Sequence, residues 1–393
     1  RNRVIYASDA VFVGPNVGNA SGAHTATGSL GFYGNKFAQM SGASLIDQLY
    51  RVQSVGWNAS VARQDVNQFG ELAALDRVIL QQPTVGLNMS WIVNGLENEA
   101  NIGLTVTNTG VAGVTSCISG ILSKVSDEKN YFIVQGIEGS DINNATINVA
   151  GTRVYALGNC FLSSYSTEGS VGNFPITNVS FEGLNYVVQT GAEQNPIPAV
   201  FPTDGTRVSG WFYKLSNPVS SLADASQPDL LISALRPGDV TVSIFESGSS
   251  TAYSEFGPDM TVANGAIQSY RLGYDLRRES LQKLGSKFAY AKEVTYPLEA
   301  TCSINGLVRD VTTGSLETIL CNDKSFDVQI DIKNPTCDAN PPVLVKYILR
   351  GAKISNQSYN LNIGSNKSFT LDFVSQVGSP TQTNLGLFLS GIN

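Results

Sequence analysis

The side chains that most often carry out chemistry in proteins are scarce and scattered in this sequence. The single histidine, His24, lies in a stretch of Gly, Ser, Ala and Thr at residues 18–28. A histidine that joins a catalytic triad or binds a metal needs partners held by a rigid strand or turn, and this stretch offers neither. We therefore expect His24 to face solvent. The sequence also has no Walker loop, no GxSxG elbow and no GxGxxG between a strand and a helix.

Carboxylate pairs are the remaining candidates for acid–base chemistry, as in glycosidases that need no histidine. They are Glu97 with Glu99, Asp127 with Glu128, and Asp141. All lie in polar segments where solvation and turn formation explain Asp and Glu. We predict a protein that is not an enzyme, with no catalytic, cofactor or metal site. A His-free glycosidase stays open as an alternative, and it would lose activity when one loop carboxylate is replaced.

Basic side chains are densest at Arg277 and Arg278, with Arg271 and Lys283 nearby. One interpretation is the solvated face of a short helix, and the other is a contact with an acidic partner or phosphate. Arg63 occupies the position that matches Arg278 in an earlier copy of the same segment, described below. Because a basic residue recurs in both copies on the face expected to point away from the core, we predict Arg63, Arg277 and Arg278 as possible subunit contacts.

Composition indicates a mainly β protein. The chain has 393 residues, of which only 15% are charged, and it contains 38 Gly and 15 Pro. Such a composition suits many strands joined by turns and few long helices. The net charge is −7, with no run of Lys and Arg longer than two. Tight nucleic-acid binding depends on Lys and Arg contacts with phosphates, so we do not expect this chain to grip DNA or RNA.

The cysteines and the chain start place further bounds on function. Five cysteines are an odd number without CxxC spacing, which argues against a disulfide framework or a zinc knuckle and favours buried thiols in a reducing compartment. We expect no membrane insertion, because no apolar run reaches transmembrane length. The first residues are polar and unlike a signal peptide, but the first residue is not Met, so removal of a leader before Arg1 stays open.

Two segments of the chain repeat each other. Residues 155–181 align without a gap on residues 347–373, and residues 60–70 align on residues 275–285. The first alignment has these identities: Tyr155/Tyr347, Leu157/Leu349, Ser163/Ser355, Ser166/Ser358, Gly172/Gly364 and Phe181/Phe373. The order of the segments is the same in both halves, which predicts one domain plan used twice. We place the two tandem domains at residues 1–182 and 183–393.

The shorter repeat has the spacing of an amphipathic helix. Ser60 and Asp275 suit the N-cap, and Gly70 and Gly285 suit the left-handed residue that ends many helices. The apolar residues between them fall on one arc of a helical wheel, namely Val61, Val66 and Phe69 in the first copy and Leu276, Leu281 and Leu284 in the second. We therefore predict two β-sandwich or barrel-like domains, each with one short α-helix packed on its sheet.

Alternating residues after each predicted helix indicate strands. Apolar residues alternate with small or polar residues over 84–91, and a similar segment begins near Leu298. The alignment offsets of the two repeats are 215 and 192 residues, so the first half has 23 more residues between them. We expect this extra length near Thr109–Asn130 and expect it to make contacts unique to one domain.

The residues that precede and follow the first repeat resemble a known family. The run from Tyr50 to Trp57, then Arg63, residues 67–70, 75–78 and 83–91, is similar to the tail tube (major tail) proteins of long-tailed bacteriophages, and residues 276–297 look similar again. The resemblance covers about half of the chain. It implies a β-sandwich with a helix that self-assembles into stacked rings, through which double-stranded DNA passes at ejection without tight binding.

The resemblance also implies partners and a location. The partners would be further copies of the chain, in rings of three chains with six similar domains, and other tail proteins. The location would be the tail of the virion, after assembly in the host cytoplasm. Two alternatives stay open from the residues alone: another virion component, such as a tail-tip, neck or capsid-surface protein, and a secreted carbohydrate-binding β-sandwich.

Overall fold

A computed structural model describes most of the chain. The described residues are 8–15, 46–108, 115–124, 127–137, 139–142, 151–190, 197–201, 205, 235–248, 266–307, 324–335, 341–360 and 368–391. His24 lies outside them. The expected β architecture is confirmed, since the described residues form antiparallel sheets with very few helices.

We describe the elements in two halves and count β11 in the first half because it pairs with β9, while the domain boundary expected after residue 182 stays a prediction. The first half contains β1 (Asp9–Pro15), β2 (Asp47–Leu49), β3 (Val52–Ser60), β4 (Arg63–Val66), β5 (Asp76–Ile79), β6 (Thr84–Ile92), α1 (Glu97–Asn101), β7 (Val106–Asn108), α2 (Ser119–Leu122), β8 (Glu128–Gln135), β9 (Arg153–Ser170), β10 (Ile176–Gly183) and β11 (Asn185–Thr190). The second half contains the 3-10 helix η3 (Pro237–Asp239), β12 (Val240–Glu246), β13 (Ala266–Asp275), β14 (Arg278–Leu281), β15 (Ala291–Val294), β16 (Leu298–Leu307), β17 (Phe326–Lys333), β18 (Val343–Asn360), β19 (Ser368–Val377) and β20 (Gly386–Gly391).

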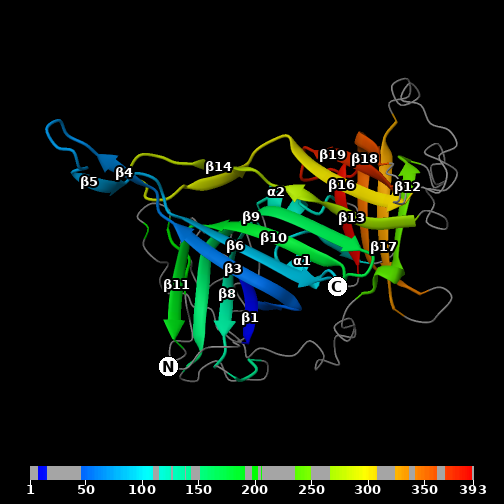
Figure 1. The fold of residues 1–393 in the computed structure, drawn as a ribbon, viewed down its shortest axis with the longest axis horizontal. Helices are drawn as coiled ribbons and strands as arrows, with labels where there is room; N and C mark the ends of the chain where they lie inside the picture. The colour runs from blue at the N-terminus through cyan, green and yellow to red at the C-terminus, as the bar shows by residue number, and fades with distance from the viewer. Residues whose placement is uncertain are drawn as a thin grey trace, which may run out of the picture.

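One sheet runs through both halves (Figure 1). Its central part has the strand order β3-β6-β10-β9-β13-β16-β19-β18, and neighbouring strands in this series are antiparallel. The two halves meet where β9 pairs with β13. We call these eight strands the central sheet.

The alternation in the sequence explains why one face of the central sheet is buried. In β6, Val85, Leu87, Met89 and Trp91 are buried, while the residues between them are exposed or half-buried. The same alternation recurs in β10, β16 and β19. Successive side chains of a strand point to opposite faces, so each strand contributes one apolar row to the core.

Two long strands bend from the central sheet into a second layer. β9 pairs with β8 and β11 through its first part and with β10 through its last part, and β18 does the same with β17, β20 and β19. Each strand has one residue with positive φ near the bend, Asn159 at 53° and Gly351 at 60°. Asn and Gly tolerate this backbone conformation best, which fits their place at the bends.

The order of strand pairing is the same in both halves. In the first half it is β1-β8-β9-β10-β6-β3 with β11 beside β9, and in the second half it is β12-β17-β18-β19-β16-β13 with β20 beside β18. A register shift occurs at matching residues, where Leu162 lies opposite Phe181 and Ile354 lies opposite Phe373. These pairs are members of the aligned segments 155–181 and 347–373.

The two predicted helices are wrong. Residues 63–66 and 278–281 are strands, which pair with β5 and β15 in two β-hairpins. Each hairpin follows directly from a strand of the central sheet, so the chain stays extended. Gly70 and Gly285 do have positive φ, at 98° and 82°, but they lie in the hairpin turns. A left-handed glycine ends a helix or forms a turn equally well, so this signal did not distinguish the two structures.

The predicted packing of these segments on a sheet is also wrong for most of their apolar residues. Leu276 is buried in the core and Leu281 is half-buried. The others are exposed, by 46% for Val61, 43% for Val66, 104% for Phe69 and 103% for Leu284. The two α-helices that the described residues do contain, α1 and α2, lie elsewhere, between β6 and β8.

The segment with the expected extra length contacts the second half. β7 pairs in parallel with β20, and the Cys117 amide donates a hydrogen bond to the Leu387 carbonyl at 2.8 Å. The Ser119 hydroxyl donates to the Pro380 carbonyl at 2.5 Å. Residues 115–124 therefore fasten the first half to the end of the second.

Candidate assembly surfaces

The face of the central sheet opposite the core is polar. Residues directly opposite one another on paired strands share a face. The cross-strand register places Ser54, Ser90, Asn178 and Ser166 on this face in the first half, and Ser303, Asn305 and Thr370 on it in the second half. Hydroxyl and amide side chains thus continue across the boundary between the halves.

Carboxylates outnumber cations on this polar face. The acidic residues are Glu168, Glu182, Asp275, Glu299 and Asp372, and the basic residues are Arg271 and Lys353. The Arg271 guanidinium lies 4.0 Å from the Glu168 carboxylate. Asp275 lies 3.5 Å from Arg277 and Glu182 lies 3.1 Å from Lys292, so Glu299 and Asp372 are the carboxylates of this set that form no ion pair within the described residues.

The first hairpin, which we call the first arm, is residues 61–83 with β4 and β5. Figure 1 shows its strands projecting away from the central sheet. All residues of both strands are exposed. Its exposed apolar residues include Phe69 and Leu72 near the tip and Leu80 at its base, at 104%, 110% and 65% exposure. Apolar surface that gathers on a projection in this way is typical of an interaction site.

The second arm, residues 276–297 with β14 and β15, is anchored to the body of the first half. The Arg278 side chain is only 1% exposed and its Nη2 lies 2.5 Å from Asp127 Oδ1. Its Nε donates to the Leu162 carbonyl at 2.9 Å, and its guanidinium lies 5.3 Å from the ring centre of Phe161. Burial raises the pKa of Asp127, and Arg278 acts against that shift.

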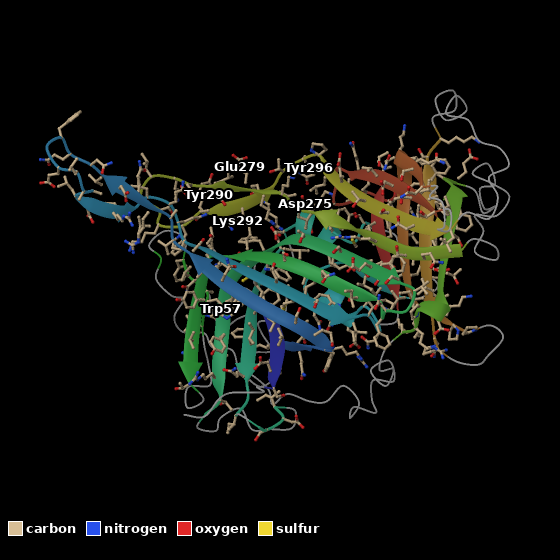
Figure 2. The ribbon with its side chains drawn as sticks, viewed as in Figure 1. Trp57, Asp275, Glu279, Tyr290, Lys292 and Tyr296 are labelled. Carbon is tan, nitrogen blue, oxygen red and sulfur yellow. The ribbon has the colours of Figure 1, made fainter. Side chains whose placement is uncertain are left out.

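Lys292 is a second anchor on the same arm. Its ammonium lies 3.1 Å from the Glu182 carboxylate and 5.8 Å from the Phe161 ring centre. Figure 2 shows Glu279, Tyr290 and Lys292 along this arm. The two arms also touch, because the Ala289 amide donates to the Gln82 side-chain oxygen at 2.5 Å.

The predicted subunit contacts therefore lie in different surroundings. Arg278 does not face away from the core as expected, because it is buried against Asp127. Arg277 is 83% exposed and lies 3.5 Å from Asp275. Arg63 lies on the exposed first arm, where it donates to the Arg77 carbonyl at 3.3 Å. Subunit contacts of Arg63 and Arg277 stay predictions.

The candidate carboxylates lie in different surroundings. Asp127 forms an ion pair with Arg278, and Glu128 accepts a hydrogen bond from the Asn159 side-chain amide at 2.7 Å. Asp141 is exposed. Glu97 begins α1 at a half-buried position, whereas Glu99 in the same helix is fully buried.

The buried Glu99 is a feature that the sequence did not predict. Its Oε1 accepts hydrogen bonds from the Trp91 indole at 3.2 Å and the Thr177 hydroxyl at 3.1 Å. Burial raises the pKa of Glu99 to about 7, although these hydrogen bonds favour the carboxylate. A Glu next to polar residues in the sequence predicts an exposed turn. Only the fold brings Glu99 into contact with β6 and β10.

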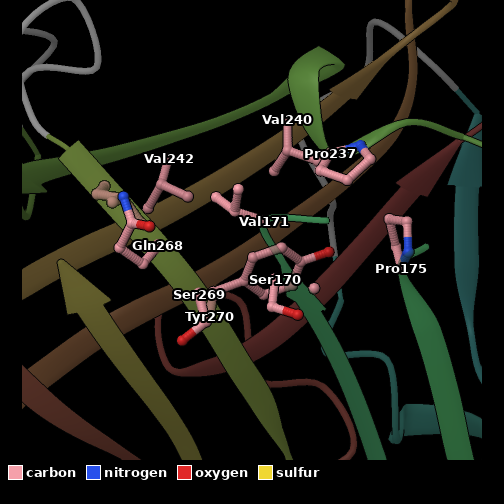
Figure 3. A pocket seen from close by; sticks show the side chains of 11 residues that line it. Ser170, Val171, Pro175, Pro237, Val240, Val242, Gln268, Ser269 and Tyr270 are labelled. Carbon is pink, nitrogen blue, oxygen red and sulfur yellow. The ribbon is translucent and has the colours of Figure 1, made fainter. Parts of the chain in front are cut away.

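A small pocket lies where the halves meet (Figure 3). Its volume is about 130 Å³, and its walls come from the end of β9, the start of β10, and from β12 and β13. The lining includes Val171, Pro175, Val242 and Tyr270 and contains no Asp, Glu, Lys, Arg or His. Tyr270 is the ionisable side chain of this lining, and burial raises its pKa.

Metal and thiol chemistry can be assessed for the described residues. Among them, no group of three His, Cys, Asp or Glu side chains is placed to hold a metal ion. Cys117, Cys160 and Cys302 are free and buried, as expected, and burial raises the pKa of all three thiols. Cys321 and Cys337 lie outside the described residues. No helix in the described part is long and apolar enough to cross a membrane.

Comparisons with known proteins give a weak structural likeness to a tail, a baseplate and the Hcp protein. No family model matches the chain, and no curated protein matches it. The chain is similar to a solved structure of the tail of an empty GTA particle, with 12% identity, a TM-score of 0.23, and coverage of 36% of this chain and 93% of that chain. It is also similar to a baseplate structure of the anti-feeding prophage (12%, TM-score 0.23, coverage 39% and 93%). A crystal structure of Hcp protein is similar at 11% identity and a TM-score of 0.21, with coverage of 38% and 96%.

Proposed function

We propose that this chain is a structural subunit of a phage tail tube, which self-assembles into stacked rings around a channel for DNA. The observation that carries the proposal is the central sheet. Its eight strands come equally from two halves with the same pairing order, and one face is polar and rich in carboxylates. We attribute the like halves to an internal duplication.

A sheet of this kind is suited to form part of a larger barrel. The central sheet begins at β3 and ends at the last part of β18 in the described residues. Copies that join edge to edge by the same contact close into a ring, and the merged sheets then surround a bore. Three chains would supply six similar halves.

The polar face would line that bore. Lys and Arg contacts with phosphates would hold DNA in place and slow its passage. Glu299 and Asp372 would repel the phosphates, and pairing of Glu168, Glu182 and Asp275 with cations limits the positive charge that the wall offers to DNA. Hydroxyl and amide groups would keep the wall hydrated. Duplex DNA would thus slide through without tight binding.

The first arm would contact the next ring of the stack. It extends from the edge strand β3 and exposes Phe69 and Leu72, whose burial against another subunit would remove apolar surface from water. The proposed partners are therefore other copies of this chain and other tail proteins. We propose a location in the virion tail after assembly in the host cytoplasm, a role without catalysis, and no membrane insertion.

Negative-stain electron microscopy of the purified chain, with light scattering for mass, tests this function. We expect rings or tubes with a central bore at high protein concentration. The variant Phe69→Ser with Leu72→Ser should keep the rings and lose the tubes, because it changes only exposed tip residues. A compact monomer at all concentrations would overturn the proposal.

A further inference from the structure

The junction between the two halves is an observed example of how two like units join. β9 and β13 pair antiparallel from Ser170 opposite Ser269 to Ser164 opposite Asp275. The Arg271–Glu168 ion pair lies within this ladder. The junction therefore fixes which strands meet and in which register.

Each strand of this junction has an equivalent in the other half. β13 corresponds to β3 at an offset of 215 residues, and both strands lead directly into an arm. β9 corresponds to β18 at an offset of 192 residues, which also relates the register shifts at Leu162 and Ile354 and the positive φ of Asn159 and Gly351. The structural matches therefore give the same residue offsets as the sequence alignment.

The equivalents of the junction strands are the two ends of the central sheet. Within the described residues, β3 pairs only with β6, and β18 from Lys353 onward pairs only with β19. An edge strand presents backbone N–H and C=O groups that can pair with another chain. β3 has nine residues and contains neither Pro nor Lys, the residues that often protect such edges.

We propose that β3 of one copy pairs antiparallel with residues 356–360 of β18 in a second copy, in the register that the β9–β13 junction sets. Ser60 would then lie opposite Asn356, Asn58 opposite Ser358, and Gly56 opposite Asn360. This inference rests on the proposed function, since it supplies the contact that closes the ring.

The side chains of the two edges suit this register. Ser60, Asn58 and Gly56 lie on the polar face of the central sheet, and so do Asn356, Ser358 and Asn360. The core faces of the two copies therefore also align, and no like charges lie opposite each other. A slip by one residue would place polar side chains against the core.

One residue makes the junction between copies differ from the one inside the chain. A Cβ added at Gly273 would lie 2.1 Å from the Tyr165 carbonyl oxygen, so β13 and β9 are close at that point. The equivalent of Gly273 in β3 is Asn58. The strands of two copies must therefore lie further apart at Asn58 than β13 and β9 do at Gly273.

At the proposed contact between copies, the first arm would not be held as the second arm is held beside the β9–β13 junction. Arg278 lies over the Phe161 ring, and the residue equivalent to Phe161 in the second half is Lys353. In the proposed contact, Lys353 of the second copy would repel Arg63, the equivalent of Arg278. The first arm thus lacks the anchor that holds the second arm, which leaves it available to the next ring.

Paired cysteines test the register in the full chain. The variant Ser60→Cys with Asn356→Cys and the variant Gly56→Cys with Asn360→Cys place two thiols opposite each other between copies. All four positions are exposed, and a Cβ at Gly56 meets nothing within 4 Å. The matched controls use the same positions in swapped combinations, Ser60→Cys with Asn360→Cys and Gly56→Cys with Asn356→Cys. Four residues along a strand separate the thiols of swapped pairs by about 13 Å.

A short bismaleimide is added to each protein under conditions that assemble it, with the unsubstituted chain treated alike. We expect a ladder of linked chains that ends at a closed ring in the predicted pairs, and at least tenfold less product in the swapped pairs and the unsubstituted chain. Rings seen by electron microscopy with no linkage of the predicted pairs, or with linkage of the swapped pairs, would overturn the register and leave the proposed function standing. Absence of any assembly would overturn both.

Discussion

Removing the Arg278 guanidinium should release the second arm from the body of the protein. Arg278→Met keeps much of the aliphatic volume but leaves the Asp127 carboxylate, whose side chain is 11% exposed, without its cation. Breaking a buried ion pair by removing one partner costs roughly 3–5 kcal/mol. The loss of the hydrogen bond to the Leu162 carbonyl contributes to this cost.

Hydrogen exchange at the β14 and β15 amides measures the effect locally. A loss of about 3 kcal/mol corresponds to exchange roughly 100-fold faster. The control is Arg277→Met, the exposed neighbour, for which we expect a change within about 0.5 kcal/mol. Adding Asp127→Asn to Arg278→Met should recover part of the protection, because the unpaired charge is then gone.

The dependence on pH gives a second check. Burial raises the pKa of Asp127 in the folded state, and the cation that opposes this shift is absent in Arg278→Met. A raised carboxyl pKa favours the folded state at low pH and costs stability as the pH rises through it. The defect of Arg278→Met should therefore be smaller near pH 4 than at pH 7. Equal exchange in the Arg277 and Arg278 variants, or a defect that grows on acidification, would refute this reasoning.

Three further predictions concern other parts of the molecule. Because the pKa of Glu99 is raised to about 7 from 4.5, the free energy of unfolding should fall by roughly 3 kcal/mol as the pH rises from 4.5 to 7. Thermal unfolding of Glu99→Gln should lack this fall, and parallel pH profiles of the two proteins would contradict the assignment. Replacing Phe69 and Leu72 by Ser should leave the melting temperature within a few degrees of the parent while tubes are lost from micrographs and rings remain. A large fall in melting temperature would show that the tip packs within the chain. Gly351→Ala should destabilise the fold by about 1–3 kcal/mol, since φ is 60° and a Cβ would clash with the Leu385 side chain. The control is Gly56→Ala, where a Cβ has open space, and equal melting temperatures of the two variants would contradict this prediction.

The parts of the fold that follow from local chemistry could be predicted from the sequence. Alternation over 84–91 predicts β6 because a strand with one buried face needs apolar residues at every second position. The aligned segments 155–181 and 347–373 correspond to strands with matching register shifts. Gly70 and Gly285 marked residues with positive φ, although the element around them was misjudged.

The parts that depend on distant residues could not be predicted. Val66 and Phe69 have the spacing of a buried helix face, but apolar residues look the same in sequence whether they meet their own core or another molecule. Arg63 and Arg278 occupy matching positions, yet only Arg278 meets a buried carboxylate, which lies 151 residues away in sequence. Glu99 is buried by strands that come from a separate part of the chain.

The seam between β9 and β13 has a geometric consequence. Because main-chain hydrogen bonds join the halves into one sheet, the width of that sheet is fixed for each copy. Eight strands at about 4.8 Å spacing span about 38 Å, so a closed barrel built from whole chains changes its circumference only in steps of this size. Three copies would give backbones about 37 Å apart across the bore before strand tilt widens it. The diameter of such a channel would thus be determined by the width of the sheet in each chain and by the number of chains in the ring.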